Sequence, residues 1–450
     1  MDVAIIGAGP TGLFLGAALA RRGHRVTAVD RDAGPGPDGG WPRRGVMQFH
    51  HAHGFRPQIV DALQAEIPEA HDGWVAAGAE PITFTLPDGR RTPGGMRSRR
   101  ETFERALRAA VVGTPGLTLR RGHVDAVTVD GSRARGLVVD GEDLTADLVI
   151  DASGRAGRAT RTLRAAPTLT GRTGVAYVDR QYRLRPGADP GPMTNPLAWQ
   201  ADLDGYQVII FRHERGIFSV LIVRPTADPD LALLRHEAAF DAACRAIPGL
   251  DAWTDPERSE PITPVLSGGA LVNHYRGQAA PDGSFHRAFV AVGDAVATTT
   301  PMFGRGITTS LQQARELLRR LDDGADPGDV AVGFDAWCEA HMRPWVADHV
   351  RMDAAMLDRW AGHDVDLSRR LPSDLVMAAA QVDPAIGSAI GPYLAMLAGP
   401  DRLDAVEPLA AAVYRSGWRP PRAEGPGRDE LAREVRAALV PAGAEPTYCR

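Results

Sequence analysis

The stretch Ile5-Ile6-Gly7-Ala8-Gly9-Pro10-Thr11-Gly12 decides the fold of this chain. It completes a short apolar run that starts at Val3 and has the form of a buried parallel strand. Gly7 allows a tight turn, Gly9 lets the backbone approach a pyrophosphate, and Gly12 lets a helix pack closely on the strand. The pattern predicts a turn that binds a dinucleotide.

The residues after this turn complete the expected unit. A helix is predicted over residues 11–22, which are rich in Leu and Ala. Its N-terminus offers free N–H groups and a positive dipole end to phosphates. A second strand over 25–29 runs into Asp30, 18 residues after Gly12, where a ribose-binding acid belongs. Strand, helix, strand and acid together favour a dinucleotide site over an unrelated glycine turn.

A second motif lies far along the chain. The apolar strand predicted over 288–292 runs into Gly293-Asp294, and the segment 298–306 (TTTPMFGRG) leads into a helix expected over about 307–321. The Asp294 carboxylate can hold a ribityl hydroxyl, and the helix N-terminus can face the pyrimidine end of a flavin, where negative charge collects on reduction. The two motifs together indicate FAD, because each end of the long cofactor then has a cradle.

These motifs, with Asp151-Ala152-Ser153-Gly154-Arg155 between them, carry a family resemblance. Over about residues 1–345 the chain resembles the FAD-dependent monooxygenases of the aromatic-hydroxylase type, which share the para-hydroxybenzoate hydroxylase fold. The resemblance implies an α/β flavoprotein with a Rossmann-like FAD-binding domain, an inserted β-sheet substrate domain and a helical C-terminal region. It also implies arginine contacts to FAD from Arg100, at the start of a helix expected over 102–112, and from Arg43 or Arg44.

The predicted FAD-binding residues come partly from the glycine motifs and partly from the family resemblance. They comprise Gly7, Gly9, Pro10, Thr11, Gly12, Asp30, Arg31, Arg43, Arg44, Arg100, Gly154, Gly293, Asp294, Pro301, Gly304, Gly306 and Ile307.

The middle motif departs from the aromatic-hydroxylase pattern. Members that bind NAD(P)H directly usually have Asp-Gly where this chain has Ser153-Gly154. The form Asp-Ala-Ser-Gly-Arg is more similar to the branch of styrene epoxidases, flavin halogenases and geranylgeranyl reductases. Reducing equivalents from NAD(P)H are therefore expected either directly or through a separate flavin reductase.

Composition excludes several classes of function. All 51 basic residues are arginine, so Schiff-base chemistry and the lysine-dependent chemistry of tryptophan-type halogenases have no candidate residue. A net charge of −5 predicts no attraction to nucleic acid. Three widely spaced cysteines, Cys244, Cys338 and Cys449, favour a reduced, cytoplasmic protein over a disulfide framework. No leader precedes the first strand and no apolar run is long enough to span a membrane, so a cytoplasmic enzyme is expected.

The chain divides coarsely into four parts. Residues 1–165 are expected to form the first part of the FAD-binding domain, 166–283 the β-sheet substrate domain, 284–345 the return of the FAD-binding domain, and 346–450 a helical C-terminal region. Strands at about 117–121, 124–129, 134–139 and 145–150 are interpreted as a small antiparallel excursion that returns to the main sheet. In the substrate domain, strands are expected over 175–184, 206–212 and 217–223, and a helix over 231–246.

The substrate pocket of such a fold lies between the flavin ring and the sheet of the second domain. Aromatic and apolar residues near it would suit an aromatic or alkene substrate. Weak catalytic candidates are hydrogen-bonding or proton-relay groups; the histidine tract lacks further ligands for zinc, so no metal is expected. The pocket candidates are Phe49, Tyr177, Trp199, Phe211, Met302 and Phe303, and the catalytic candidates are His50, His51, His53, Tyr206 and His213.

The function expected from these motifs is that of an FAD-dependent monooxygenase. It would hydroxylate or epoxidise a small, largely apolar molecule with dioxygen through a flavin C4a-hydroperoxide, in a role such as specialised metabolism, while the protein orients the substrate and excludes water. The alternative is an FAD-dependent reductase or dehydrogenase that acts on carbon–carbon bonds, similar to geranylgeranyl reductases.

Overall fold

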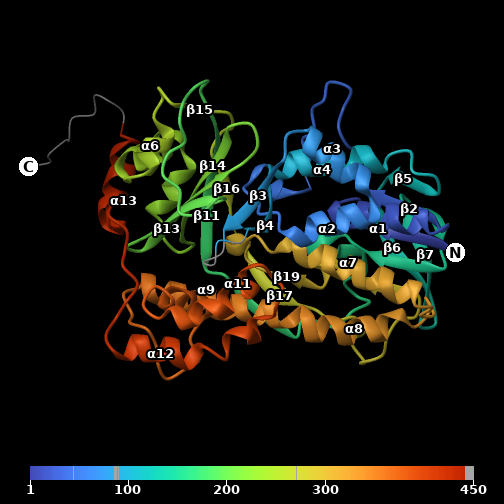
Figure 1. Ribbon diagram of the computed structural model, residues 1–450. Coiled ribbons are helices and arrows are strands. Elements are labelled where there is room, and N and C mark those ends of the chain that lie inside the picture. The colour runs from blue at the N-terminus through green and yellow to red at the C-terminus, as the bar shows by residue number, and fades with distance from the viewer. Residues whose placement is uncertain (44, 86–88, 90, 270, 441–450) are drawn as a thin grey trace, which may run out of the picture.

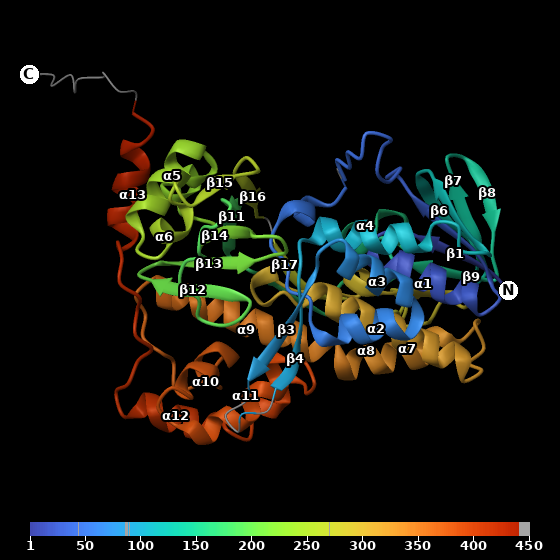
Figure 2. The same ribbon diagram turned by 45° about the horizontal axis from the view of Figure 1, so that its top comes forward.

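The computed structural model describes residues 1–43, 45–85, 89, 91–269 and 271–440, with the side chain of residue 172 left aside. Figure 1 shows three regions: the N-terminal domain at the right, a second sheet at the upper left, and a layer of C-terminal helices below both. Figure 2 shows that α9 (Arg343–Trp360) runs beneath the second sheet. Both α/β character and the two-sheet arrangement match the predicted fold class.

A five-stranded parallel sheet forms the centre of the N-terminal domain, in the order β18-β9-β1-β2-β5. Strand β1 pairs with β2 on one side and with β9 on the other, with Val3 opposite both Val26 and Leu148. The strand order therefore reverses at β1, and the carboxyl ends of β1 and β9 open a crevice there. The strands are β1 (Asp2–Ile6), β2 (Arg25–Asp30), β5 (Leu117–Arg121), β9 (Leu148–Asp151) and β18 (Phe289–Ala291).

Helices cover this sheet because its strands are apolar on both faces. On one side α1 packs against α7 and α4, in a core that includes Phe14, Leu107 and Leu317. The predicted helices after the two glycine motifs are thereby confirmed. The elements of this layer are α1 (Pro10–Arg21), α2 (Pro57–Glu66), α3 (Pro68–Ala76), β3 (Glu80–Thr85), β4 (Arg91–Arg97), α4 (Arg100–Val111) and α7 (Gly306–Asp322).

The predicted antiparallel excursion is only partly right. Residues 117–121 form β5, which pairs in parallel with β2 and extends the main sheet. The expected strand 145–150 is two strands, because Ala146 and Asp147 lie between β8, which ends the antiparallel sheet, and β9, which enters the parallel one. The excursion consists of β6 (Val124–Asp130), β7 (Arg133–Val139) and β8 (Glu142–Thr145).

The second sheet has the order β12-β13-β14-β11-β15, with β16 also paired to β11. All its pairs are antiparallel, so alternate residues face opposite sides. The expected helix over 231–246 is a short 3₁₀ turn (Leu231–Arg235) followed by α5. Its elements are β11 (Val175–Leu184), β12 (Ala198–Leu203), β13 (Tyr206–Arg212), β14 (Ile217–Pro225), α5 (Glu237–Ala246), α6 (Leu250–Thr254), β15 (Ser259–Pro261) and β16 (Leu266–Gly268).

A small three-stranded sheet joins the two larger sheets. It runs β10 (Leu169–Arg172), β17 (Val272–Tyr275) and β19 (Ala297–Thr298), all antiparallel. Because β10 leaves the N-terminal domain and β17 returns to it, this ribbon marks the connection between the two domains. The exact domain limits stay a prediction, and the limit drawn at 345/346 falls inside α9.

The last third of the chain forms a helical layer with its own core around Trp345, Tyr393 and Tyr414. The final helix, α13, crosses to the far side of the molecule and packs on α5 (Figure 1). Within the described residues, no helix combines the length and apolarity that crossing a membrane requires. The remaining helices are α8 (Val330–His341), α10 (Ser373–Ala379), α11 (Gly387–Leu394), α12 (Glu407–Arg415) and α13 (Arg428–Ala437).

Candidate FAD and substrate site

The first glycine motif sits at the carboxyl end of β1, against the loop that follows β9. Gly7 has a φ of +99°, and a Cβ atom there would lie 2.6 Å from the Ala152 oxygen. A Cβ atom on Gly12 would lie 1.9 Å from the Gly7 oxygen. Any larger residue would force backbone apart at both places, so the close strand-to-helix turn depends on these two glycines.

The second glycine motif meets the first. A Cβ atom on Gly293 would lie 3.3 Å from Thr11 Oγ1 and 3.2 Å from Ser310 Oγ. Helix α7 begins at Gly306, whose Cβ position is 4.0 Å from Asp294 Oδ1. The folded chain therefore brings the N-termini of α1 and α7 to one crevice, as the two-cradle interpretation requires.

Asp30 and Arg43 line the crevice beside the glycine loop. The Ala8 N–H donates to Asp30 Oδ2 at 2.7 Å. Arg43 is 4% exposed, and its Nη2 lies 3.8 Å from the Cβ position of Gly9. The Arg43 Nη1 atom lies 4.0 Å from Asp30 Oδ2, so the predicted ribose acid and one predicted arginine share the site. Arg31 is exposed, and Arg44 lies outside the described residues.

A buried carboxylate links the two predicted arginines. Glu104 is fully buried on α4; it accepts a hydrogen bond from Arg43 Nε at 3.1 Å and one from Arg100 Nε at 2.5 Å. Burial disfavours each of these charged groups on its own, whereas the hydrogen bonds between opposite charges offset that cost. Arg100 is held in turn toward the crevice, where its charge and that of Arg155 oppose the rise in pKa that burial imposes on Asp294.

His53 is fixed as a neutral imidazole. Its Nδ1 lies 3.0 Å from the His51 carbonyl oxygen, and its Nε2 lies 3.2 Å from Arg100 Nη1. The carbonyl can only accept and the guanidinium can only donate, so the proton is on Nδ1. Burial, followed by the Arg100 charge, holds the pKa of His53 well below its usual value. His53 therefore orients Arg100 and does not carry a mobile proton.

The loop before α7 is held from two sides. Gly304 has a φ of +56°, and its Cβ position is 3.2 Å from the Gly54 nitrogen. Arg56 donates to the carbonyl oxygens of Phe303 and Gly304, both at 2.7 Å. Burial, then the charge of Arg305, lowers the pKa of Arg56 to about 9. The histidine-rich segment thus abuts the predicted flavin loop.

An apolar cluster fills the space between the second sheet, α9 and this loop. Tyr177 and Phe211 belong to it, and Met302 reaches it from the loop. Helix α9 contributes side chains at i, i+1 and i+4, which form one helical face. We call this set the apolar cluster; its main side chains are Tyr177, Ile209, Phe211, Met302, Met356, Leu357 and Trp360.

A buried histidine–aspartate pair borders the apolar cluster. His51 Nδ1 lies 3.3 Å from Asp179 Oδ2, and both side chains are at most 4% exposed. The Ala52 N–H donates to the same carboxylate oxygen at 2.9 Å. The His51 ring meets the Tyr177 ring edge-on, with centroids 5.1 Å apart. Burial and then Asp179 raise the pKa of Tyr177, so this phenol stays protonated beside the pair.

Other predicted site residues lie elsewhere. Trp199 and Tyr206 face the opposite side of the second sheet, because strands β12 and β13 alternate and present Ala198 and Phe211 to the apolar cluster instead. Tyr206 donates to the Pro426 oxygen at 2.8 Å, which ties it to the segment before α13. His213 contacts the Ser98 oxygen and Ser219 Oγ in a buried, structural position.

The remaining aromatic candidates pack at the edges of the site. Phe49 is buried against Trp41, with ring centroids 5.1 Å apart. Phe303 points toward the C-terminal helices and meets His349 edge-on at 5.7 Å. His50 lies at the surface, 3.6 Å from Glu101. The structure therefore gathers Tyr177, Phe211 and Met302, and leaves the other three pocket candidates outside the apolar cluster.

The crevice fits FAD by its own chemistry. Glycines at its narrow points leave room for a ligand to approach the backbone. Pro10 and Thr11 lie at the start of α1, and Ile307 lies at the start of α7. Two buried hydroxyl oxygens, Thr300 Oγ1 and Thr308 Oγ1, have no hydrogen-bond partner within the described part of the chain. Buried polar atoms are normally paired, so both are suited to meet a polar ligand beside the Pro301 turn.

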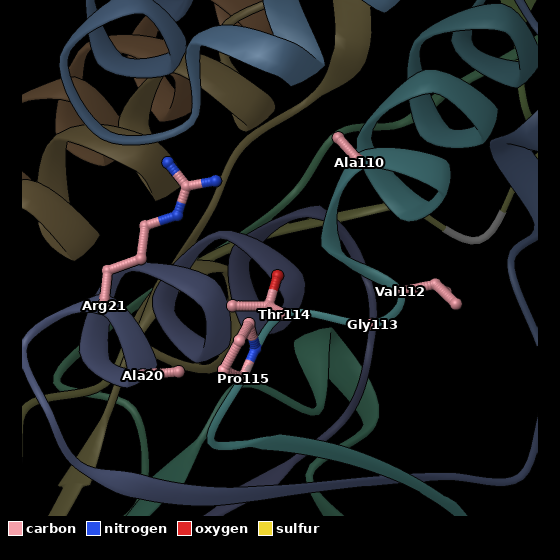
Figure 3. A pocket seen from close by; sticks show the side chains of 7 residues that line it. All are labelled: Ala20, Arg21, Ala110, Val112, Gly113, Thr114 and Pro115. Carbon is pink, nitrogen blue, oxygen red and sulfur yellow. The ribbon is translucent and has the colours of Figure 1, made fainter.

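Another cavity is unrelated to this site. A surface hollow of about 500 Å³ lies between the C-terminal ends of α1 and α4. Figure 3 shows Arg21 at one side and Val112 at the other, with Thr114 and Pro115 on its floor. Its position at the far ends of both helices separates it from the glycine motifs. In the described ranges, no cluster of His, Cys, Asp or Glu with metal-ligand geometry occurs.

Several residues of the site gave no signal in the sequence. Asp179, Arg56 and Glu104 act through partners distant along the chain, so no local motif marks them. The face of α9 that lines the apolar cluster has helical spacing at Met356, Leu357 and Trp360 and could have been found by periodicity alone.

Comparison with known proteins agrees with the fold. A family model described as lycopene cyclase protein matches residues 2–171. Over 65 residues the chain is 49% identical to the NAD-dependent dihydropyrimidine dehydrogenase subunit PreT of Escherichia coli (strain K12), a match that covers 14% of this chain and 13% of that protein. The curated relative thus shares one short segment with this chain.

Solved structures match over much more of the chain. The flavin-dependent brominase Bmp2 has a TM-score of 0.63 at 15% identity, covering 93% of this chain and all of that one. PqsL, a probable FAD-dependent monooxygenase from Pseudomonas aeruginosa, has a TM-score of 0.58 at 16% identity and covers 80% of this chain and 98% of its own. The predicted flavoprotein fold is confirmed.

Proposed function

We propose that this protein is an FAD-dependent monooxygenase that hydroxylates or epoxidises a small, largely apolar aromatic or alkene substrate. The observation that carries the proposal is the meeting of the two glycine motifs at a crevice that adjoins the apolar cluster. FAD held there would supply the redox chemistry and the activation of dioxygen. The fold shared with Bmp2, a flavin-dependent brominase, and PqsL, a probable FAD-dependent monooxygenase, supports flavin-dependent oxidative chemistry.

The protein's own residues would bind, orient and exclude water. Gly7, Gly9 and Gly12 would admit the pyrophosphate, Asp30 and Asp294 would accept hydrogen bonds from hydroxyl groups of FAD, and Arg100 would bring a positive charge to the crevice. The apolar cluster would hold the substrate and keep the reacting atoms dry, which favours oxygen transfer over loss of hydrogen peroxide.

The His51–Asp179 pair is the best-placed proton acceptor. It is buried, borders the apolar cluster, and lies in the segment that abuts the flavin loop. Asp179 Oδ2 lies 3.3 Å from Nδ1, so a small rotation of the ring would let Asp179 accept a hydrogen bond from Nδ1 and leave Nε2 as the atom that takes a proton from a phenol. An alkene substrate would not need this step.

The first test concerns FAD itself. Asp294→Ala is expected to weaken FAD binding about tenfold or more, because one hydrogen bond to a charged group is lost. Asp143→Ala, an exposed aspartate on β8, is the control and should bind FAD as the parent protein does. Equal FAD affinity in both variants would contradict the assigned crevice.

The second test concerns the reaction. The FAD-loaded protein is reduced without oxygen and mixed rapidly with oxygenated buffer, with and without a panel of phenols and alkenes. A transient absorbing species before the oxidised spectrum returns, and label from ¹⁸O₂ in a product, are the expected results. His51→Gln should remove a pH-dependent step with phenols and leave alkene turnover intact; equal losses with both substrates would exclude the base role.

A reductase acting on carbon–carbon bonds is the second candidate. It is favoured by the Asp151–Arg155 segment, which has the form found in geranylgeranyl reductases and lies within the residues matched by the lycopene cyclase model. Very slow reaction of the reduced protein with oxygen, together with saturation of an alkene without label incorporation, would favour this candidate. Direct reduction by NADH or NADPH, compared with reduction by an added flavin reductase, would identify the electron source.

A further inference from the structure

A cavity of about 250 Å³ lies behind the middle motif, and we call it the arginine cavity. Four guanidinium groups line it, from Arg155, Arg161, Arg164 and Arg276, together with the imidazole of His274. Gly154 and Ala295 place it next to the crevice, but its lining does not include the glycine loop of residues 7–12 or the loop of 301–306.

The positive charge in the arginine cavity is largely uncompensated. Among the described residues, the one carboxylate within ion-pair distance of these four side chains is Asp151, 3.6 Å from Arg164 Nη2. Asp151 is already engaged, because it accepts from Ser153 N at 3.0 Å, from Ser153 Oγ at 2.6 Å, and from Thr160 Oγ1. At most one of the four cations is therefore balanced.

Arg164 is built into the wall of the arginine cavity. It is 3% exposed and donates to the Ala295 oxygen at 2.8 Å. Its Nε atom is buried without a hydrogen-bond partner in the described part of the chain, as is the Nε atom of Arg276. Buried unpaired Nε atoms also occur on other arginines of the described chain, such as Arg224 and Arg305, so the feature that distinguishes the cavity is its uncompensated charge.

The charge state of the lining also favours an anion. Burial lowers the pKa of Arg164 to about 10, so this group is charged at neutral pH. Burial, and then Arg276, Arg164 and Arg155, lower the pKa of His274, which leaves this imidazole neutral; its Nε2 lies 3.3 Å from Thr298 Oγ1. Ser153 (φ −73°, ψ 0°) and Gly154 (φ +75°) form a right-handed and left-handed pair, a backbone shape that turns N–H groups toward anions; the Ser153 N–H already donates to Asp151.

We infer that the arginine cavity is a binding site for a phosphate or diphosphate group carried by a second small molecule. Guanidinium forks match phosphate oxygens bidentately, and several charges suit a multiply charged group better than a single carboxylate. At roughly 30 Å³ per water molecule, a cavity of about 250 Å³ has room for such a group. The inference does not depend on the monooxygenase proposal.

Inorganic pyrophosphate tests the site directly. Its affinity is measured by calorimetry at constant ionic strength, in the protein saturated with FAD and in the same protein without added FAD. Arg161→Gln and Arg276→Gln are each expected to weaken binding about tenfold or more. Arg158→Gln is the matched control: Arg158 is exposed in the same segment but does not line the cavity, so its affinity should equal that of the parent protein.

Two results would overturn the inference. One is equal affinity in all three variants and the parent protein; the other is mutual exclusion of FAD and pyrophosphate, which would make the cavity part of the FAD crevice. Arg161 and Arg276 are chosen because they are less buried than Arg164, whose replacement could disturb the fold. Because pyrophosphate binding is also measured without added FAD, failure of FAD to bind would leave this result interpretable.

A competition experiment then separates two sources of the phosphate. Displacement of pyrophosphate by NADPH would assign the group to a nicotinamide dinucleotide that donates electrons, and a weaker effect of NADH would place the 2′-phosphate in the cavity. Pyrophosphate binding that neither dinucleotide disturbs would assign the group to a phosphorylated substrate. Both results support the site.

Discussion

Two groups of arginines flank the same crevice and differ in how their charge is balanced. Arg43 and Arg100 share the buried Glu104, and Arg43 also lies 3.8 Å from Asp32. The arginine cavity on the other side of the middle motif has one engaged carboxylate for four guanidinium groups. The first group is locked in place by the protein, whereas the second group has donors that the protein leaves unpaired.

Arg305 is a third case, in which aromatic rings and one nearby carboxylate surround a fully buried guanidinium group. Arg305 is fully buried between Phe303, Trp345 and Tyr393, with its guanidinium carbon 4.4–4.9 Å from the three ring centroids. It also lies 3.3 Å from Asp348. This arginine fastens the flavin loop to the C-terminal helices. Carboxylates and rings thus fix Arg43, Arg100 and Arg305 in place, whereas three of the four arginines of the cavity have no carboxylate within ion-pair distance in the described part of the chain.

The largest expected effect comes from breaking the compensated group. Glu104→Gln should lower the free energy of unfolding by about 3 kcal/mol, because Arg100 and the buried Arg43 lose the carboxylate that they share and Arg43 keeps only the more distant Asp30 and Asp32. Urea denaturation measures it. Glu101→Gln, on the same helix and paired with Arg105 at a partly exposed site, is the control, with an expected cost of at most about 1 kcal/mol. Equal costs would refute the distinction between the two sites.

Asp353 is a buried carboxylate that has no cation within ion-pair distance in the described part of the chain. It is 2% exposed and accepts from Asn273 at 2.6 Å; burial raises its pKa to about 7. Because the folded pKa lies above the unfolded value, its contribution to stability is complete below about pH 4 and is lost as pH rises through 7. That loss amounts to up to about 4 kcal/mol.

Asp353→Asn should therefore flatten the fall in stability between pH 4 and 7, as unfolding curves at several pH values will show. Asp143→Asn is the exposed control and should keep the parent profile. Parallel profiles for Asp353→Asn and the parent protein would show that Asp353 is ionised in the folded state.

The Arg305 site should give an intermediate effect. Arg305→Met is expected to cost about 2–4 kcal/mol, because Asp348 loses its nearer cation; it keeps Arg351 at 3.8 Å and hydrogen bonds from Ser373 and Tyr393. Thermal and urea unfolding measure the loss. Arg343→Met, exposed and paired with Glu339, should change stability by less than about 0.5 kcal/mol. A loss below about 1 kcal/mol for Arg305→Met would mean that the helices hold the loop by other contacts.

The smallest effect is expected in the arginine cavity. Arg161→Gln and Arg276→Gln should leave the free energy of unfolding within about 0.5 kcal/mol of the parent value, or raise it slightly, because like charges are removed. Denaturation without phosphate in the buffer is the measurement. A loss above about 1 kcal/mol would show that these arginines hold the structure and would remove the contrast with Arg43 and Arg100.

The fold was largely predictable because its deciding signals are local. The glycine turn at 7–12, the strand that ends in Asp30 and the motif at 293–306 each encode backbone shape and burial within a few residues. The sheet assignments failed where pairing partners are distant: the strand predicted over 117–121 is present but joins β2, and residues 145–150 divide between two sheets.

By itself, the sequence determined the α/β flavoprotein fold, the FAD motifs and the absence of lysine chemistry, since all three follow from residue type and short spacing. The tertiary structure alone decided that His51 meets Asp179, that Trp199 faces away from the apolar cluster, and that Arg161, unlike Arg43, has no carboxylate within ion-pair distance among the described residues. The physical reason is that charge balance and burial depend on side chains distant along the chain, which meet only after packing.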